Sequence, residues 1–269
     1  MSTGDVLLKC GLGLALALVA AGLLASVSVY LGQDKMLFTG AYQDLPAQQV
    51  PATAVPILDS RGSPWAWVVN PEKAPKKTVI YLHGNGVRAE KRMVSLADTF
   101  TSRGYRVVFP EYPGFGVRKG VAPNKEVVLA DLTRLIHKIR SDFPNEEEWL
   151  FGESLGAGLS ALLASPKTEK VVLITPWHRM SDVAAEHFPL LPIKWLVRSE
   201  YDSCEALLDK TEKVHVVYAG KDELIPARHA ESLTSCLSSQ AENVLLLPYS
   251  THNDWQHWMA AKDWDALLP

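Results

Sequence analysis

The chain has 269 residues, of which 47% are hydrophobic and 21% are charged. That is enough apolar material for one large domain or two small ones. Its 27 Lys and Arg residues against 30 Asp and Glu residues leave a net charge of −3 with no basic excess, which argues against a nucleic-acid partner. Its three cysteines, Cys10, Cys204 and Cys236, are too few for a disulfide framework and lack metal-ligand spacing. The sequence permits a single Cys204–Cys236 disulfide, but we do not expect one.

The N-terminal segment has the length and composition of a membrane-spanning helix. Cys10–Gln33 contains no charged residue, and Leu, Ala, Val and Gly dominate it. As a helix, Cys10–Leu31 would extend roughly 33 Å, enough for a hydrocarbon core of about 30 Å. A cleavable signal peptide remains an alternative, with Val19-Ala20-Ala21 as an acceptable cleavage site. The length favours a retained single-pass anchor, so we expect residues 1–35 to form the anchor and residues 36–269 the domain.

The charges flanking this segment specify its orientation only weakly. Lys9 precedes the apolar stretch, whereas Asp34 and Lys35 follow it. The balance slightly favours an amino terminus in the cytoplasm. We therefore expect the domain on the non-cytoplasmic side.

After an extended connection over residues 36–55, short apolar runs alternate with helical patterns. Helices are expected at Arg88–Ser102, Lys125–Arg140 and Ala157–Ala164. Strands are expected at Thr78–Leu82, Tyr105–Phe109, Trp149–Phe151, Val171–Ile174, Val214–Tyr218 and Val244–Leu247. This alternation predicts an α/β fold with a mostly parallel central sheet and helices on both faces. Such sheets bind ligands at the carboxyl ends of their strands.

One motif at such a strand end carries nucleophile chemistry. Gly152-Glu153-Ser154-Leu155-Gly156 stands between a predicted strand and a predicted helix. This G-x-S-x-G pattern is typical of a nucleophile elbow, which exposes the serine hydroxyl on a strained turn. Side chains at Gly152 and Gly156 would clash there. We therefore predict Ser154 as the nucleophile.

A serine nucleophile needs a base, and the base needs an acid to hold its tautomer. Around this elbow the chain order is serine, acid, histidine. His252 follows the last predicted strand directly and is the predicted base. His229 and His257 also come late enough, but both fall in helical runs, where packed or surface histidines are expected.

The acid is expected in the loop after the strand Val214–Tyr218. Asp222 is the predicted acid. Its neighbour Glu223 is the main alternative, although it also suits a solvated helix entry. Asp202 and Asp209 are weaker reserves in the preceding segment.

The oxyanion of a tetrahedral intermediate needs preorganised donors. The elbow predicts the backbone N–H of Leu155 as one donor. The loop after the strand Thr78–Leu82 supplies the other, which we assign to the backbone N–H of Asn85 in His83-Gly84-Asn85-Gly86. His83 precedes the nucleophile, so we expect it to brace this loop. This chemistry requires neither a metal nor an organic cofactor.

These motifs resemble the α/β-hydrolase superfamily of serine hydrolases. More narrowly, the chain is similar to a membrane-anchored, minimal-cap group that includes protein depalmitoylases and lysophospholipid lipases. The matching pieces are the apolar span, Gln33–Phe38, His83–Asn85, Tyr112–Gly116, Gly152–Gly156, Tyr201–Ser203, Gly220–Pro226 and His252–Asp254. Glu111 stands where an Asp is usual, and Arg118-Lys119 replaces a Ser-containing stretch. These departures bear on substrate range rather than on the triad.

The resemblance implies a short cap at about residues 175–213, between the strands Val171–Ile174 and Val214–Tyr218. Its apolar run Phe188–Val197 would either line an acyl-chain site facing the bilayer or simply pack on the sheet. We therefore expect a carboxylesterase or thioesterase that acts through an acyl-enzyme on a small or lipid-like acyl substrate. An amidase or peptidase with the same triad, and a catalytically silent membrane-anchored interaction module, are the alternatives. The sequence leaves the oligomeric state open.

Overall fold

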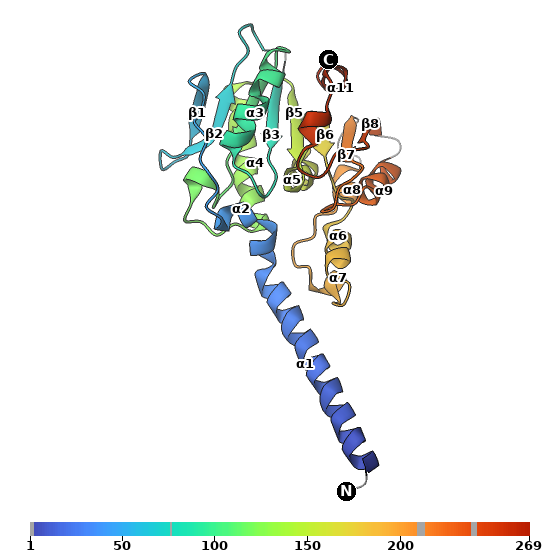
Figure 1. Ribbon diagram of the computed structural model, residues 1–269. Helices are drawn as coiled ribbons and strands as arrows, with labels where there is room; N and C mark the ends of the chain where they lie inside the picture. Colours follow the sequence, from blue (N-terminus) through green and yellow to red (C-terminus); the bar gives the residue numbers. More distant parts are fainter. Residues whose placement is uncertain (1–2, 76, 209–212, 238–240) are drawn as a thin grey trace.

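The computed structural model describes residues 3–75, 77–208, 213–237 and 241–269. A long helix, α1 (Thr3–Leu37), extends from an α/β body, and a short helix, α2 (Thr39–Tyr42), follows at the edge of the body (Figure 1). The connection expected over residues 36–55 was therefore wrong at its start, because helix continues to Tyr42 with a break at Phe38. Only the part after Tyr42 is an irregular connection.

The body is built on one sheet with the strand order β1-β2-β4-β3-β5-β6-β7-β8. Strands β3 to β8 pair in parallel, whereas β2 is antiparallel to both β1 and β4. The strand bounds are β1 Ala54–Leu58, β2 Pro64–Val69, β3 Thr78–Leu82, β4 Arg106–Pro110, β5 Glu148–Glu153, β6 Thr168–Ile174, β7 Val214–Ala219 and β8 Ala241–Leu247. The predicted α/β class with a mostly parallel sheet is confirmed.

Strands β1 and β2 were not expected from the sequence. β1 contains Pro56 and lies at the edge of the sheet, where a residue without an N–H is tolerated. β2 begins at Pro64 and pairs with β4. Both strands are apolar in sequence, but each contains a proline, which argues against an interior strand position.

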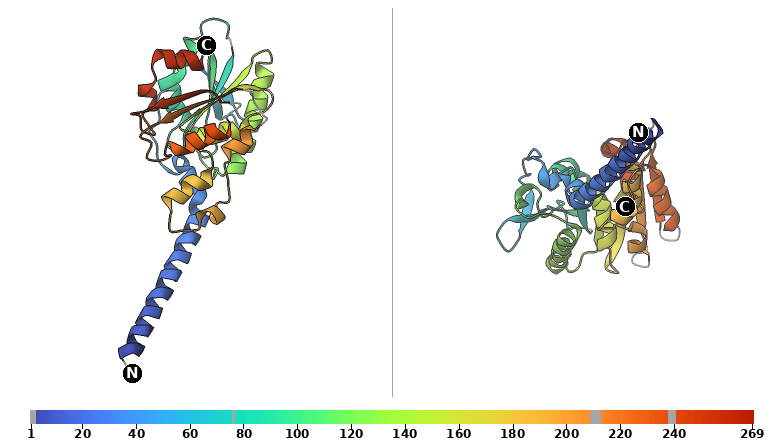
Figure 2. Two further views of the ribbon diagram at one scale, coloured as in Figure 1. Left: turned by 90° about the vertical axis from the view of Figure 1, so that its right-hand side faces the viewer. Right: turned by 90° about the horizontal axis from the view of Figure 1, so that it is seen from below.

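Alternate residues of each central strand supply opposite faces of the sheet. In β3, Ile80 and Leu82 belong to one apolar cluster, with the helices α4, α5, α8 and α9. Val79 and Tyr81 belong to the other cluster, with α3 and α11. Both faces are covered, which explains why these strands are mostly apolar (Figure 2).

The helices lie close to where the apolar patterns predicted them. α3 spans Ala89–Thr101, α4 Lys125–Asp142 and α5 Leu155–Leu163, so α5 begins directly after Ser154. The remaining bounds are η1 Gly116–Arg118, α6 Met180–His187, α7 Ile193–Leu196, α8 Ser203–Leu207, α9 Arg228–Cys236, α10 Trp255–Trp258 and α11 Ala261–Leu267.

Helices α6, α7 and α8 form an insert between β6 and β7. The α6–α7 part projects from the body on the side from which α1 leaves it, and α7 contacts α1 (Figures 1 and 2). The carboxyl ends of the strands, the insert and the end of α1 therefore lie in one region of the molecule.

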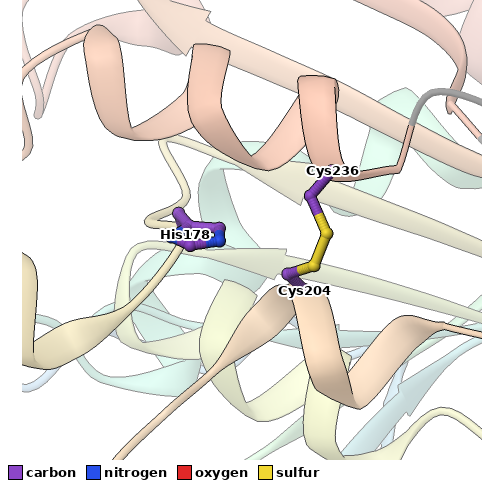
Figure 3. A group of neighbouring side chains, drawn as sticks. All are labelled: His178, Cys204 and Cys236. Atoms are coloured by element: carbon purple, nitrogen blue, oxygen red, sulfur yellow. A yellow bond between two sulfur atoms is a disulfide. The ribbon is translucent and has the colours of Figure 1, made fainter.

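A disulfide joins Cys204 of α8 to Cys236 of α9. This bridge was not expected, because the two cysteines stand 32 positions apart in the sequence and only the fold brings the helices together. The side chain of His178 lies beside it (Figure 3). A thiolate is the form of cysteine that binds metal, so the bridged sulfurs do not make this group a metal site.

Candidate active site

The turn after β5 holds Ser154 in a conformation that few residues adopt. Its backbone has φ 52° and ψ −116°. A positive φ is uncommon for any residue other than glycine. The turn is also too tight for side chains beside it. A Cβ on Gly156 would lie 2.0 Å from the carbonyl oxygen of Leu82, and one on Gly152 would lie 2.1 Å from that of Gly156. Both glycines are therefore required by packing.

Three side chains from separate strand ends form one hydrogen-bonded chain. The Oγ of Ser154 lies 2.9 Å from Nε2 of His252. The Nδ1 of the same imidazole lies 2.7 Å from Oδ2 of Asp222. His252 and Asp222 are 7% and 8% exposed, so solvent screens this chain little. An imidazole held in this way can accept the hydroxyl proton through Nε2 and share its own Nδ1 proton with the carboxylate.

Backbone donors fix the acid in place. The other oxygen of the Asp222 carboxylate accepts hydrogen bonds from the N–H groups of Leu224 and Ile225, at 2.9 and 2.7 Å. Both oxygens of the carboxylate are thus engaged, one by the loop and one by His252. The loop after β7 therefore orients Asp222 without help from other side chains.

A second carboxylate organises the loop that carries the histidine. Asp254 accepts hydrogen bonds from the backbone N–H of Thr251 and the hydroxyl of Ser250. Burial raises the pKa of Asp254, but these bonds and one from the Trp258 indole lower that pKa overall. These bonds connect the residues before and after His252 and so fix the conformation of its loop.

The loop after β3 passes directly over the elbow. The carbonyl oxygen of Gly84 lies 2.8 Å from Nδ1 of His83, and the hydroxyl of Tyr112 donates to the His83 carbonyl at 2.8 Å. A trans peptide holds its N–H opposite its C=O, so the N–H of Asn85 points away from the His83 ring. Asn85 and Leu155 both line the cavity at Ser154.

Helix α2 holds the same loop from outside. The N–H of Gly40 donates to the carbonyl of Asn85 at 2.8 Å, and a Cβ on Gly40 would lie 2.5 Å from that oxygen. The segment directly after α1 therefore positions the peptide that precedes Gly86.

Glu153 precedes the nucleophile and connects the loop after β3, helix α3 and helix α10. Its carboxylate accepts hydrogen bonds from the N–H of Gly84 at 3.0 Å, from Nε of Arg92 at 2.6 Å and from the indole of Trp255 at 3.1 Å. Burial raises the pKa of Glu153, but the Arg92 guanidinium and the Gly84 N–H lower it overall. This role was not predicted from the sequence, because Glu153 occupies a variable position of the G-x-S-x-G motif.

The alternative acids lie elsewhere. Glu223 is exposed, and Asp202 caps α8 and pairs with Arg179. Asp209 lies outside the described residues. Of the alternative bases, His229 lies buried in α9 beside Glu186, and His257 is exposed in α10.

A cavity of about 520 Å³ leads from Ser154 and His252 toward α1. Most of its lining is apolar, and two segments supply the larger part of it. Helix α1 contributes Val29, Gln33, Asp34, Met36 and Leu37. The insert contributes Met180, Val183, Phe188, Ile193, Leu196 and Val197, among others. Part of the run Phe188–Val197 thus lines a cavity, whereas Leu190 and Trp195 are exposed.

Comparison with known proteins identifies the fold. The chain superposes on an esterase of Pyrococcus furiosus with a TM-score of 0.62 and 17% identity, covering 82% of this chain and 95% of that one. An α/β serine hydrolase without lid from Xanthomonas campestris gives a TM-score of 0.59 at 19% identity, covering 83% and 99%. Residues 73–200 match the family described as serine aminopeptidase, S33. The chain has the α/β-hydrolase fold.

Curated relatives of this chain include an uncharacterized protein of Mycobacterium tuberculosis. It is 29% identical over 174 residues, which cover 63% of this chain and 61% of the relative. Lysophosphatidylserine lipase ABHD12 of Xenopus tropicalis is 24% identical over 173 residues, covering 62% of this chain and 43% of the lipase. The matches thus span less than two thirds of the length of these relatives.

Proposed function

We propose that the protein is a serine hydrolase that cleaves a carboxylic ester or thioester through an acyl-enzyme. The observation that carries the proposal is the hydrogen-bonded chain Ser154–His252–Asp222 at the end of an apolar cavity. In this proposal the Oγ of Ser154 attacks the acyl carbonyl while Nε2 of His252 takes the hydroxyl proton. Asp222 holds the imidazole tautomer and stabilises the imidazolium that forms.

The tetrahedral intermediate places negative charge on the former carbonyl oxygen. The backbone N–H groups of Leu155 and Asn85 are the proposed donors to that oxygen. His252 then protonates the leaving alcohol or thiol, and the acyl group remains on Ser154. Water, activated by the same imidazole, releases the acid and restores the free hydroxyl.

The lining of the cavity favours an acyl substrate over a peptide. An aminopeptidase must bind the charged amino terminus of its substrate. Among the described residues that line the cavity, the one carboxylate is Asp34, and it is paired with Arg198 at 2.9 Å. Apolar side chains supply most of the remaining surface, which suits a hydrocarbon chain.

We further propose that α1 anchors the protein in a membrane with the hydrolase domain on the non-cytoplasmic side. The 35-residue helix is long and apolar enough to cross a bilayer. The Cys204–Cys236 disulfide supports the orientation, because such bridges persist in oxidising compartments.

A fluorophosphonate probe tests the chemistry without a choice of substrate, because it reacts with an activated serine. We expect the full-length protein to be labelled and the Ser154→Ala variant to be unlabelled. Matched ester, thioester and amide substrates with one acyl group then separate the reactions, with the ester and thioester cleaved faster. A folded wild-type protein that resists labelling would contradict the proposal, and a preference for the amide would reassign it to an amidase.

A further inference from the structure

The end of α1 is part of the cavity and is not merely attached to the body. Val29, Gln33 and Met36 line the cavity from α1, at a spacing of three to four residues that places them on one face of the helix. Across from them lie side chains of α6, α7 and the loop between them. Without α1, one side of the cavity would open to its surroundings.

Specific contacts hold this part of α1 against the insert. The side-chain amide of Gln33 accepts a hydrogen bond from the N–H of Arg198 at 2.8 Å and donates to the carbonyl of Leu196 at 3.3 Å. The Arg198 guanidinium pairs with Asp34 at 2.9 Å and lies 5.0 Å from the ring centroid of Tyr30. We name this group of five residues the α1 clasp.

The same part of α1 falls at the edge of the span. A hydrocarbon core needs about 20 helical residues, and counting from Cys10 this brings the boundary to Val29. The charged residues Asp34 and Lys35 follow five and six positions later. If α1 spans a bilayer, the α1 clasp and the cavity therefore lie level with the boundary between acyl chains and headgroups.

The tip of the insert carries exposed apolar side chains near that level. Leu190 and Trp195 are 96% and 90% exposed. They belong to the part of the insert that projects beside α1 (Figure 1). Tryptophan is enriched at membrane interfaces, where its amphipathic ring suits the headgroup layer. An apolar tip in this position would contact the bilayer instead of water.

We propose that α1 is itself a wall of the acyl-chain site, which it forms together with the α6–α7 insert and which opens at the bilayer surface. This inference rests on the proposed function. The acyl chain lies between α1 and the insert with its carbonyl at Ser154, and it enters from the lipid layer beside Leu190 and Trp195. A volume of about 520 Å³ falls within the usual range of small-molecule sites.

Filling the cavity from the α1 side tests the site. Val29→Trp places a large ring in the cavity, whereas Val27→Trp adds the same ring about 200° around the helix, away from it. Val27 is 54% exposed and does not line the cavity. The full-length proteins are compared on p-nitrophenyl esters in detergent micelles. We expect Val29→Trp to lower the C16-to-C4 ratio of kcat/KM by about 10-fold or more, and Val27→Trp to leave that ratio unchanged.

Fluorophosphonate labelling of each variant separates the possible failures. If the wild type is neither labelled nor active on any ester, the proposed function fails and this inference fails with it. If all proteins are labelled but Val29→Trp keeps the wild-type ratio, the proposed function stands and α1 is not a wall of the acyl site. Equal losses in both tryptophan variants would likewise overturn the inference, since they would reflect a general effect on α1.

Entry from the bilayer has its own test. The double variant Leu190→Glu with Trp195→Glu is compared with Val94→Glu, which adds a charge at an exposed apolar position of α3. The substrate is one long-chain ester, presented either in phosphatidylcholine vesicles or in detergent micelles. We expect the double variant to lower the vesicle-to-micelle rate ratio by about 10-fold and Val94→Glu to leave it unchanged. An unchanged ratio in the double variant would overturn entry from the bilayer.

Discussion

The backbone N–H of Gly84 donates to the carboxylate of Glu153 at 3.0 Å, which ties the loop after β3 to the turn that carries Ser154. The proposed oxyanion donors, Asn85 and Leu155, lie one and two positions further along the chain from the two ends of this bond. A single buried carboxylate thus sets the spacing between two segments that stand 69 positions apart. Arg92 donates to the same carboxylate oxygen as Gly84, and the indole of Trp255 donates to the other oxygen.

This relationship predicts that Glu153 acts as a positioning residue. Glu153→Gln preserves the shape but weakens the bonds to Gly84 and Arg92, so we expect kcat for ester hydrolysis to fall by about 10- to 100-fold with little change in KM. Glu148→Gln is the matched control, because Glu148 is a buried carboxylate paired with Arg140 at the opposite end of the same strand. Its loss is expected to lower stability and leave kcat near the wild-type value. Equal kcat losses in both variants would indicate a general effect on β5.

The same carboxylate predicts a pH dependence of stability. The folded-state pKa of Glu153 lies below its ordinary value of 4.5, so the folded state binds fewer protons than the unfolded state. The resulting stabilisation is fully present above pH 4.5 and is lost as the pH falls through the folded-state pKa. Thermal unfolding midpoints should therefore decrease below pH 4.5 more steeply for the wild type than for Glu153→Gln. Parallel pH profiles for the two proteins would refute this assignment.

The assignment of Asp222 as the acid can be tested against the adjacent carboxylate, Glu223. Asp222→Asn keeps the size of the side chain but favours the wrong imidazole tautomer, so we expect kcat to fall by about 10⁴-fold. Glu223→Gln removes a charge at the adjacent, exposed position and should change kcat less than about twofold. Steady-state kinetics on one short-chain ester suffice for both. A large loss in Glu223→Gln together with a small one in Asp222→Asn would reverse the assignment.

The elbow predicts a contrast between two glycines. In Gly156→Ala the new Cβ would lie 2.0 Å from the Leu82 carbonyl oxygen, and backbone cannot give way cheaply. We expect a loss of about 3 kcal/mol or more in the free energy of unfolding. In Gly86→Ala the new Cβ meets no atom of a described residue within 4 Å, and stability should stay within about 1 kcal/mol of the wild type. Denaturant unfolding measures both, and an equally stable Gly156→Ala would contradict the close packing of the elbow against β3.

The amino-acid sequence by itself determined the features that depend on neighbouring residues. The apolar runs predicted the parallel strands, since a strand buried on both faces must be apolar along its length. Gly152–Gly156 predicted the elbow, because a tight turn requires glycine at set distances from the serine. The order of the loops after β5, β7 and β8 pointed to Ser154, Asp222 and His252 as candidates, and the fold places these three side chains in one hydrogen-bonded chain.

Only the tertiary structure decided the features that depend on segments far apart in the chain. Glu153 contacts Gly84, and Cys204 is bridged to Cys236, through pairings that leave no local pattern. The edge strand β1 contains Pro56 and only one of its five residues is buried, so its place in the sheet is set by pairing with β2. In the sequence, Val29 does not differ from the other apolar residues of a membrane span. It becomes part of the cavity because the insert folds back against α1, and burial between distant segments is set by packing that local sequence does not encode.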